Sequence, residues 1–389
     1  MSVPFSFKKS TAHQFPHEIS RHVAVTWKSA TIIWGGYSEN DHTPLPLSDV
    51  HIFLSGKWIR KETTGTVPED SARYHISDDV VQVVNQKMYV LIALSSGERV
   101  VYSLDLGTWI WECFSPSGPL PFKLRLRGGL SSWTHEEKTY YFGGKAHIEP
   151  NDKNIYKRPP YLELEKYFSL DEFPNAYVVN LLFCYNTCNN TWEWPHIEGD
   201  IPSPRFGHKT VISGDIVFLY GGVSGAWAQE HCNDLYILDM TCMRWKQIHG
   251  NISSRKSCSV PTLTRISQSA AVLFGFGTSS CWYLDLEKAK QQRDSSSIWT
   301  EVQTTFMRLD HAAVLEPVSQ KLWVVGGYKR QGDSWTRIRT TSDVLKMSFN
   351  HVPLKVLAMD CVAKSININD ERLLPDQFPM QLRNELKHM

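Results

Sequence analysis

The chain has almost no net charge, no long apolar run and no apolar leader. Its 389 residues carry 41 Lys and Arg against 40 Asp and Glu, a net charge of +1. Because the charges balance, the composition predicts neither a nucleic-acid partner nor a membrane surface as a target. No window offers about eighteen uninterrupted apolar residues, and the N-terminus lacks a stretch of signal-peptide length. We therefore expect a protein of the cytoplasm, the nucleus or both.

Cysteines are also few, and they are scattered. The eight cysteines lie mostly in apolar or strand-like segments, so we expect reduced packing residues rather than a disulfide framework. Cys184 and Cys188 are the closest pair, but no second pair of Cys or His ligands with the usual spacing lies nearby. The sequence therefore predicts no metal site. Its 42% of apolar residues predict a globular chain with ample material for a core.

Apolar runs that end in paired glycines recur along the chain. The pairs are Gly35–Gly36, Gly143–Gly144, Gly221–Gly222 and Gly326–Gly327, and two weaker copies occupy 88–97 and 272–277. Neighbouring copies are separated by about fifty residues, apart from one longer interval that indicates an insertion after the third-repeat glycines. A repeat of this length is typical of a β-propeller blade or a solenoid unit.

Each repeat contains four strand-like segments in a fixed order. A basic residue or histidine precedes the apolar run, a third apolar segment follows the glycines, and a tryptophan marks the fourth segment. The basic positions are His22, Arg73 with His75, Arg127, Arg205 with His208, and Arg308 with His311. The tryptophans are Trp58, Trp109 or Trp111, Trp192 or Trp194, Trp245 and Trp299. Four strands per repeat predict an all-β, six-bladed propeller in which these residues serve packing rather than ligand binding.

The repeat around Pro204–Trp245, with PRFGH, FLYGG, NDLYILD and a tryptophan, resembles the kelch family of β-propellers. The resemblance covers about residues 15–350 and implies a six-bladed kelch propeller over 1–350. In that family the loops after the glycine pairs gather on one face around the central channel. Here these loops are 37–48, the long third-blade loop 145–175, 223–232 and 328–342. The aromatic residues of 145–175 predict an ordered lid rather than a linker.

The loop of the sixth repeat, 328–342, is strongly basic. It carries Lys329, Arg330, Arg337 and Arg339 beside Trp335, with a single acidic residue. Arginine offers planar bidentate hydrogen bonding and tryptophan a rigid wall, so the loop is a candidate site for a carboxylate or an acidic side chain. The alternative interpretation is a solvated loop with ordinary surface charge.

The C-terminal segment 351–389 lacks the repeat and predicts a short α-helical tail of two amphipathic helices. The segment resembles the paired boxes by which substrate receptors of cullin-RING E3 ubiquitin ligases bind an elongin adaptor and a cullin scaffold. Val356 and Ser365 depart from the first box. The positions that match the two boxes, and are the implied adaptor-binding residues, are Leu357, Cys361, Leu374, Pro375, Phe378 and Leu382. The resemblance implies a non-catalytic receptor subunit whose propeller binds a protein or peptide degron.

Among such receptors, the sequence is similar to those that recognise C-terminal glycine degrons. In that group two fourth-blade arginines and a fifth-blade serine hold the terminal carboxylate. Val223 and His231 stand here at the arginine positions and Ser257 matches the serine, so Arg255 with Lys256, or the sixth loop, would have to supply the charge. The candidate substrate-binding residues are Tyr37, Lys145, His147, His231, Arg255, Lys256, Ser257, Tyr328, Lys329, Arg330 and Trp335.

Two other classes of function stay open. Some kelch propellers are copper oxidases with a Tyr-Cys cofactor, but no histidine pair here is joined by a plausible third ligand. No glycine-rich phosphate loop or nucleophile elbow is present either, so we expect no enzymatic activity and no cofactor. A non-ligase kelch scaffold or cytoskeletal interaction module would use the propeller face alone.

The chain ends indicate how the ring closes. The sixth repeat ends at 343–348 without a tryptophan strand, and FSFKK at 5–9 precedes the first repeat with no obvious partner. We expect the N-terminal segment to form the outer strand of the last blade, which removes an exposed sheet edge. The alternative is closure by 351–356.

Overall fold

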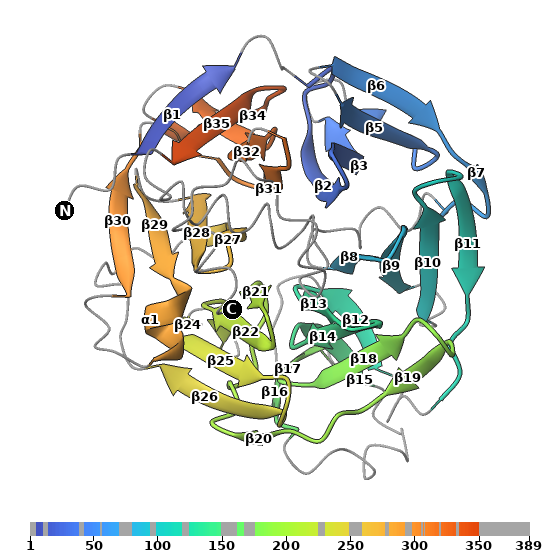
Figure 1. The fold of residues 1–389 in the computed structure, drawn as a ribbon, viewed down its shortest axis with the longest axis vertical. Coiled ribbons are helices and arrows are strands. Elements are labelled where there is room, and N and C mark those ends of the chain that lie inside the picture. The colour runs from blue at the N-terminus through green and yellow to red at the C-terminus, as the bar shows by residue number, and fades with distance from the viewer. Residues whose placement is uncertain are drawn as a thin grey trace, which may run out of the picture.

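Six antiparallel sheets are arranged as blades around a central axis (Figure 1). None of the helices in the part of the chain described is long and apolar enough to cross a membrane. The computed structural model describes residues 5–10, 15–38, 43–54, 57–69, 80–93, 99–118, 124–148, 162–166, 176–224, 230–248, 259–276, 280–291, 298–304, 306, 308–318, 320–331 and 334–349.

The first three blades run from an inner strand at the axis to an outer strand at the rim. Blade 1 contains β2 (Ser20–Trp27), β3 (Ala30–Ser38), β5 (Asp49–Leu54) and β6 (Lys57–Glu62), with β4 (Thr43–Pro44) paired to β3. Blade 2 contains β8 (Val81–Val84), β9 (Lys87–Ala93), β10 (Arg99–Asp105) and β11 (Ile110–Phe114), with β7 (Thr64–Gly65) outside it. Blade 3 contains β13 (Ser131–His135), β14 (Lys138–Phe142), β18 (Leu182–Asn186) and β19 (Thr191–Glu193).

The last three blades repeat the same order. Blade 4 contains β21 (Lys209–Ser213), β22 (Ile216–Tyr220), β25 (Leu235–Asp239) and β26 (Arg244–Ile248), with β20 (Glu198–Gly199) outside it. Blade 5 contains β27 (Ser259–Ser267), β28 (Ala270–Phe276), β29 (Ser280–Asp285) and β30 (Trp299–Gln303), with the one-turn helix α1 (Leu286–Lys290) after β29. Blade 6 contains β31 (Ala312–Glu316), β32 (Lys321–Val325), β35 (Val344–Phe349) and β1 (Phe5–Ser10). The predicted all-β six-bladed propeller is confirmed.

Four blades carry additional strands between their second and third strands; in blade 1 this strand is β4. In blade 3 the added strands β15 (Lys145–Ile148), β17 (Ala176–Val179) and β16 (Leu164–Lys166) join β12 (Leu124–Gly128), which precedes the inner strand, in a separate sheet of order β12, β15, β17, β16. Blade 4 carries the hairpin β23 (Val223–Ser224) with β24 (Glu230–His231), and blade 6 carries β33 (Tyr328–Gln331) with β34 (Ser334–Thr340). The described parts of the predicted third-blade loop are therefore strands, whereas 149–161 and 167–175 lie outside the described residues.

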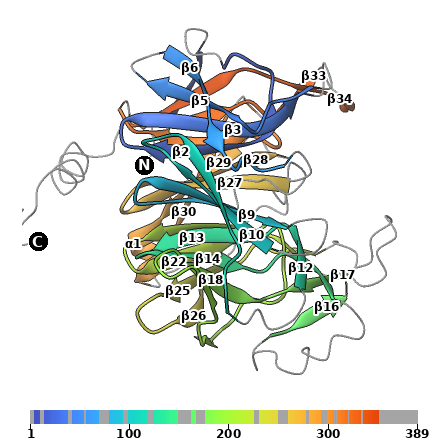
Figure 2. The same ribbon diagram turned by 90° about the vertical axis from the view of Figure 1, so that its right-hand side faces the viewer.

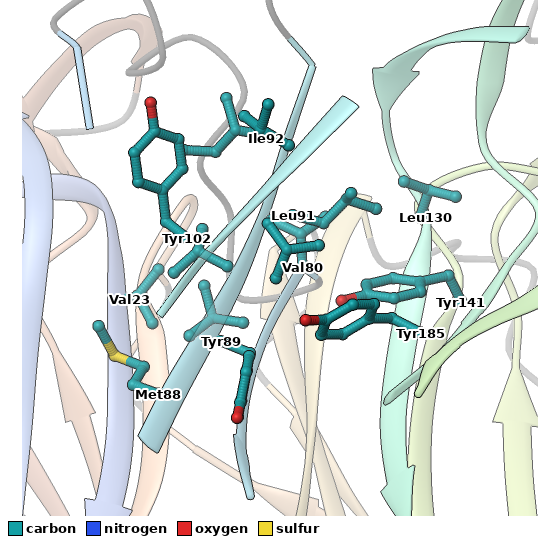
Figure 3. Close-up of a cluster of buried hydrophobic side chains, with 14 of the residues drawn as sticks. Val23, Val80, Met88, Tyr89, Leu91, Ile92, Tyr102, Leu130, Tyr141 and Tyr185 are labelled. Carbon is teal, nitrogen blue, oxygen red and sulfur yellow. The ribbon is translucent and has the colours of Figure 1, made fainter. Parts of the chain in front are cut away.

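Apolar clusters join neighbouring blades. The largest cluster spans blades 1 to 3, where Val23 of β2, Met88 and Leu91 of β9, and Tyr141 and Tyr185 of blade 3 lie together (Figure 3). All five side chains are buried. Because no blade can cover both of its own faces, burial between blades supplies the apolar stabilisation of the ring.

The outer-strand tryptophans occupy equivalent places in five blades. Trp111, Trp192 and Trp245 are buried in β11, β19 and β26, while Trp58 and Trp299 are half-buried in β6 and β30. The predicted packing role is confirmed. Trp109 and Trp194, the two alternatives, lie beside these strands rather than in them.

The glycine pairs allow an inner-strand histidine of the next blade to approach the backbone. A Cβ at Gly143 of blade 3 would lie 2.7 Å from Cε1 of His208 in blade 4, and a Cβ at Gly326 of blade 6 would lie 2.9 Å from Cε1 of His22 in blade 1. Gly143 also has φ of 68°, a conformation that side chains with a Cβ rarely adopt. The positive φ and the close neighbour together require glycine at this position.

A second set of glycines, which the repeat pattern did not reveal, joins the linker before blade 2 and the linker before blade 4 to the outer strand of that blade. Thr64–Gly65 pairs in parallel with β11, and Glu198–Gly199 pairs in parallel with β26. A Cβ at Gly199 would meet the carbonyl oxygen of Trp245 at 2.1 Å. The sequence signal is a glycine followed three residues later by proline, as in Gly65–Pro68 and Gly199–Pro202.

The N-terminal strand closes the ring. β1 pairs antiparallel with β35 from Phe5 opposite Phe349 to Ser10 opposite Val344, and it is the outermost strand of blade 6. The predicted closure by the N-terminal segment is confirmed. The alternative strand 351–356 lies outside the described residues.

Deleting residues 1–10 should therefore destabilise the propeller, because β35 loses its whole hydrogen-bonded partner. We expect the melting temperature in scanning calorimetry to fall by roughly 5 °C or more. Deleting only residues 1–4 keeps β1 and serves as the matched control. Equal melting temperatures for the two deletions would contradict closure by β1.

Three buried histidines predict a stability that depends on pH. Burial lowers the pKa of His22 and of His311 to about 3, and it holds the pKa of His208 well below its usual value. The folded state therefore keeps them neutral, whereas the unfolded chain takes up protons near pH 6.5. The free energy of unfolding should fall as the pH drops from 7 to 5.5, by about 1 kcal/mol for each histidine.

Urea denaturation at pH 7 and pH 5.5 measures this effect. Replacing His311 by Gln removes one titrating group and should reduce the difference between the two pH values by about a third. A free energy of unfolding that is the same at both pH values would show that these rings are protonated without cost in the folded state.

Candidate functional site

The connections that follow the second strand of each blade lie at one end of the ring, because all six blades share one radial strand order. Figure 2 shows β33 and β34 of blade 6 and β12, β16 and β17 of blade 3 projecting at this end. We call this end, formed by β4, β12, β15, β16, β17, β23, β24, β33 and β34, the hairpin face. It is the face to which the kelch resemblance assigns the candidate substrate-binding residues.

A buried ion pair supports the hairpin of blade 4. The guanidinium of Arg205, 1% exposed, donates from two nitrogens to the carboxylate of Asp234 at 2.6 and 3.1 Å. It also donates to the carbonyl oxygen of Gly221 at 3.1 Å and to Ser203, and it lies over the ring of Tyr236. Because Gly221 and Asp234 flank β23 and β24, this one side chain ties together both ends of the hairpin.

The electrostatics of the pair follow from its geometry. Burial opposes the charge of Arg205, but the hydrogen bonds and charge of Asp234 outweigh burial and raise the pKa of the guanidinium. The arginine is therefore a permanent, fully hydrogen-bonded cation that holds the hairpin rather than a group that binds a ligand. This confirms the packing role predicted for the basic residues that precede the inner strands.

Blade 6 repeats the arrangement with a second cation. Arg308 donates to Asp343 at 3.3 Å, and Nζ of Lys329 lies 3.6 Å from the same carboxylate. Burial lowers the pKa of Arg308 despite Asp343. Asp343 is only 7% exposed, whereas Lys329 is 39% exposed. One buried carboxylate therefore faces two cations at the base of β33 and β34.

Blade 1 departs from this arrangement. Ile19 stands where blades 4 and 6 have arginine, and the equivalent carboxylate, Asp49, is paired instead with Arg60 of the outer strand at 2.8 Å. His51 lies in the same strand as Asp49, and burial together with the neighbouring His17 lowers its pKa to about 4. This blade is therefore built around an aromatic and histidine cluster.

The hairpin face is continuous between blades 3 and 4. Nζ of Lys145 in β15 lies 4.0 Å from the centre of the Phe206 ring, and the backbone of Phe206 exchanges hydrogen bonds of 2.9 and 3.1 Å with Val223 of β23. A cation held over an aromatic face is a favourable contact. Lys145 is thus positioned at the seam between the third-blade sheet and the fourth-blade hairpin.

The central channel forms a cavity of about 330 Å³. Its wall consists of the six inner strands, and its polar groups are used between blades. Gln82 donates to Ser132, Thr210 Oγ1 donates to the Ser132 carbonyl oxygen at 3.2 Å, and Thr264 donates to the Ala313 carbonyl oxygen. These hydrogen bonds make the channel wall part of the scaffold, so the candidate site is the hairpin face above it.

The structure brings together some of the predicted site residues. Val223 and His231, predicted to stand at the arginine positions of the degron receptors, are directly opposite each other in the β23–β24 hairpin. Tyr37 is half-buried and opposite Pro44. Tyr328 is buried, and its backbone bridges to Leu309 of the preceding segment.

Other predicted residues are placed by their backbone alone or not at all. His147, Arg330 and Trp335 occupy positions in β15, β33 and β34. Residues outside the described part of the chain are Arg255, Lys256 and Ser257, together with the adaptor-binding set Leu357, Cys361, Leu374, Pro375, Phe378 and Leu382.

The predicted position of Arg127 is confirmed for the backbone. Arg127 lies in β12, four residues before the inner strand β13 begins at Ser131, as Arg205 lies four residues before β21 and Arg308 four before β31. The residue after each arginine pairs with the residue after a glycine pair, Gly128 with Lys145, Phe206 with Val223 and Leu309 with Tyr328. The packing role of the Arg127 side chain stays a prediction.

Within the described residues, no group of three or more His, Cys, Asp or Glu side chains could hold a metal ion. The six cysteines in this part of the chain are free. Burial raises the pKa of Cys184 and of Cys281 to about 12, so both thiols stay protonated at neutral pH.

Comparisons with known proteins agree with the fold. The Attractin/LZTR1 β-propeller family model matches residues 171–351. Kelch domain-containing protein 2 of Bos taurus is 26% identical over 279 residues, which cover 67% of this chain and 63% of the relative. Host cell factor 2 of Homo sapiens is 27% identical over 237 residues, 58% of this chain and 26% of that protein. The chain thus matches less than two thirds of the length of these relatives.

The solved structure of YjhT aligns with a TM-score of 0.55 at 14% identity and covers 85% of this chain and 95% of that one, a likeness of fold alone. The six blades with their glycine and tryptophan repeats form a β-propeller of the kelch type, and the matches above are similar to this chain in part of its length. Within that class it is similar to kelch domain-containing protein 2 and to the host cell factors.

The Arg205–Asp234 pair predicts a large effect of a small substitution. Asp234→Asn leaves a buried guanidinium without a counter-charge and should cost about 3–5 kcal/mol of stability in urea denaturation. The matched control is Asp310→Asn, because Asp310 pairs with Arg21, which is 65% exposed, and this change should cost less than about 1 kcal/mol. Equal costs for the two variants would exclude a supporting role for the buried pair.

Proposed function

We propose that the chain is the substrate-recognition subunit of a cullin-RING E3 ubiquitin ligase. In this proposal the hairpin face binds a peptide degron of the client, and the C-terminal tail binds elongin and cullin. The observation that carries the proposal is a kelch-type propeller followed directly by both box patterns, Leu357 with Cys361 and then Leu374, Pro375, Phe378 and Leu382.

The geometry of the last blade supports a division of labour between the two ends of the ring. β35 begins at Val344, opposite Val325 beside the glycine pair, and ends at Phe349. The chain therefore leaves the propeller at the end away from the hairpin face. A client on the hairpins and an adaptor on the tail would not compete for one surface.

The mode of client recognition would differ from that of the glycine-end receptors that the sequence resembles. Val223 and His231 carry no fixed positive charge, and a carboxylate that loses its donors on burial is strongly disfavoured. We propose that the client is a protein or peptide held by other basic residues of the hairpin face, in the cytoplasm, the nucleus or both.

Co-purification tests the proposal. Wild-type chain should retain elongin and cullin, and Leu357→Ser combined with Pro375→Ala should lose both, because the substitutions remove an apolar anchor from each box. Val356→Ser with Ser365→Leu restores the box pattern and should strengthen retention. The same melting temperature for all variants shows that the propeller is intact.

The main alternative is a scaffold that uses the propeller without a ligase. The similarity to host cell factor 2, of which the match covers 26%, supports this alternative. Absence of elongin and cullin from the wild-type preparation, or equal amounts with wild type and the double variant, would establish the scaffold and reject the receptor.

A further inference from the structure

Positive charge is concentrated in four strands of the hairpin face. β12 and β15 of blade 3 and β33 and β34 of blade 6 contain seven Lys or Arg residues and no Asp or Glu. The whole chain has 41 basic and 40 acidic residues, so these strands depart sharply from its balance. We call them the basic strands. Their Lys and Arg residues are Arg125, Arg127, Lys145, Lys329, Arg330, Arg337 and Arg339.

The strand register places like charges opposite each other. Lys329 is the direct partner of Arg339 in the β33–β34 hairpin. Like charges at directly opposite positions destabilise a strand pair. A two-stranded hairpin with this pairing gains stability when an anion lies against it, so the arrangement favours a negatively charged ligand.

The neighbouring carboxylate does not neutralise the hairpin. Asp343, the acidic group at its base, is buried and already accepts a hydrogen bond from Arg308. Lys329 shares that same carboxylate at 3.6 Å and is itself partly exposed. Two cations and one anion leave a net positive charge at the base of the sixth-blade hairpin, before the arginines of β34 are added.

The two groups of basic strands face each other across the ring. Blades 3 and 6 are three blades apart in a ring of six, and the ring is continuous because each inner strand contacts its neighbours. Figure 1 places β12 and β15 on the other side of the axis from β34, and Figure 2 places β12 and β34 at the same end. A ligand that meets both groups must be extended across the channel mouth.

We propose that the basic strands bind an extended acidic segment of a protein partner, with carboxylates at both ends of the span. Arginine is suited to this ligand because its planar guanidinium binds carboxylates through paired hydrogen bonds. Lys145, held over Phe206, is a cation at the third-blade end of the span. The positive electrostatic potential of both groups of strands also attracts an acidic partner as it approaches the hairpin face. This inference rests on the proposed recognition role of the hairpin face and names the chemical class of its ligand. It does not depend on binding of elongin or cullin by the tail.

Fluorescence anisotropy tests the proposal with a labelled twelve-residue peptide rich in Asp and Glu, amidated at its C-terminus. The matched peptide has Asn and Gln at the same positions. The acidic peptide should bind the full chain at least tenfold more tightly than the amide peptide, and its affinity should fall as KCl is raised from 50 to 300 mM. Amidation ensures that side-chain carboxylates, and not a terminal carboxylate, are measured.

Charge reversals locate the site. Arg337→Glu with Arg339→Glu in blade 6, and Arg125→Glu with Lys145→Glu in blade 3, should each weaken binding at least tenfold. Lys57→Glu with Lys61→Glu on the rim strand β6, where both residues are exposed, gives the same change in net charge and should leave binding within twofold. Arg337→Gln with Arg339→Gln is the milder variant if the reversal lowers the melting temperature.

Equal binding of the two peptides, or equal loss with the rim control, would overturn the proposal. Binding of a single-stranded oligouridylate with rejection of the acidic peptide would overturn it in favour of a nucleic-acid surface. Because the assay contains no elongin or cullin, failure here leaves the co-purification result unchanged, and failure of co-purification leaves this affinity unchanged.

Discussion

The approach of a buried histidine to a glycine of the preceding blade is the constraint on which the ring depends. Gly143 with His208 and Gly326 with His22 leave no room for a Cβ atom, so the distance between these blades is set by a backbone and an imidazole ring. The imidazole must also stay neutral, because it is fully buried. At each of these contacts between blades, the close packing of the histidine ring therefore requires that the ring be neutral.

The hairpin face begins at these seams. Each loop leaves the propeller directly after its glycine pair, and the buried arginines of blades 4 and 6 hold the loop bases to a carboxylate at the start of the third strand. The carboxylates Asp234 and Asp343 are therefore engaged inside the scaffold. Lys329, farther along the sixth-blade hairpin, is thereby part of a rigidly supported surface.

Much of this fold could be predicted because it repeats. Six apolar runs, four of them ending in a glycine pair and five followed by a tryptophan, define the blades, and FSFKK without a partner indicated the closing strand β1. The third-blade sheet could not be predicted in the same way, since β12 occurs once and pairs with an insertion. The ion pair between Asp49 and Arg60 of blade 1 could not be predicted either, because it depends on tertiary contacts. Ile19 stands there in place of the arginine that pairs with the equivalent carboxylate in blades 4 and 6.

The candidate site was predicted less completely than the fold. The basic character of the sixth loop was evident from Lys329 and Arg330, but the opposition of Lys329 to Arg339 requires the register. Arg127 occupies a repeat-equivalent place in the sequence, and the pairing of Gly128 with Lys145 repeats the bridge that follows Arg205 and Arg308. Repetition identifies residues that all blades share, whereas recognition uses residues in which the blades differ.

The composite last blade has a consequence during protein synthesis. Its rim strand is synthesised before every other strand of the propeller, and its other three strands are synthesised last. Until Phe349 has emerged, the nascent polypeptide carries an open sheet edge and an uncapped apolar interface. A chain truncated before Phe349 would keep this sheet edge and apolar surface exposed. Chaperones and proteases can recognise such a surface, which the closed propeller lacks.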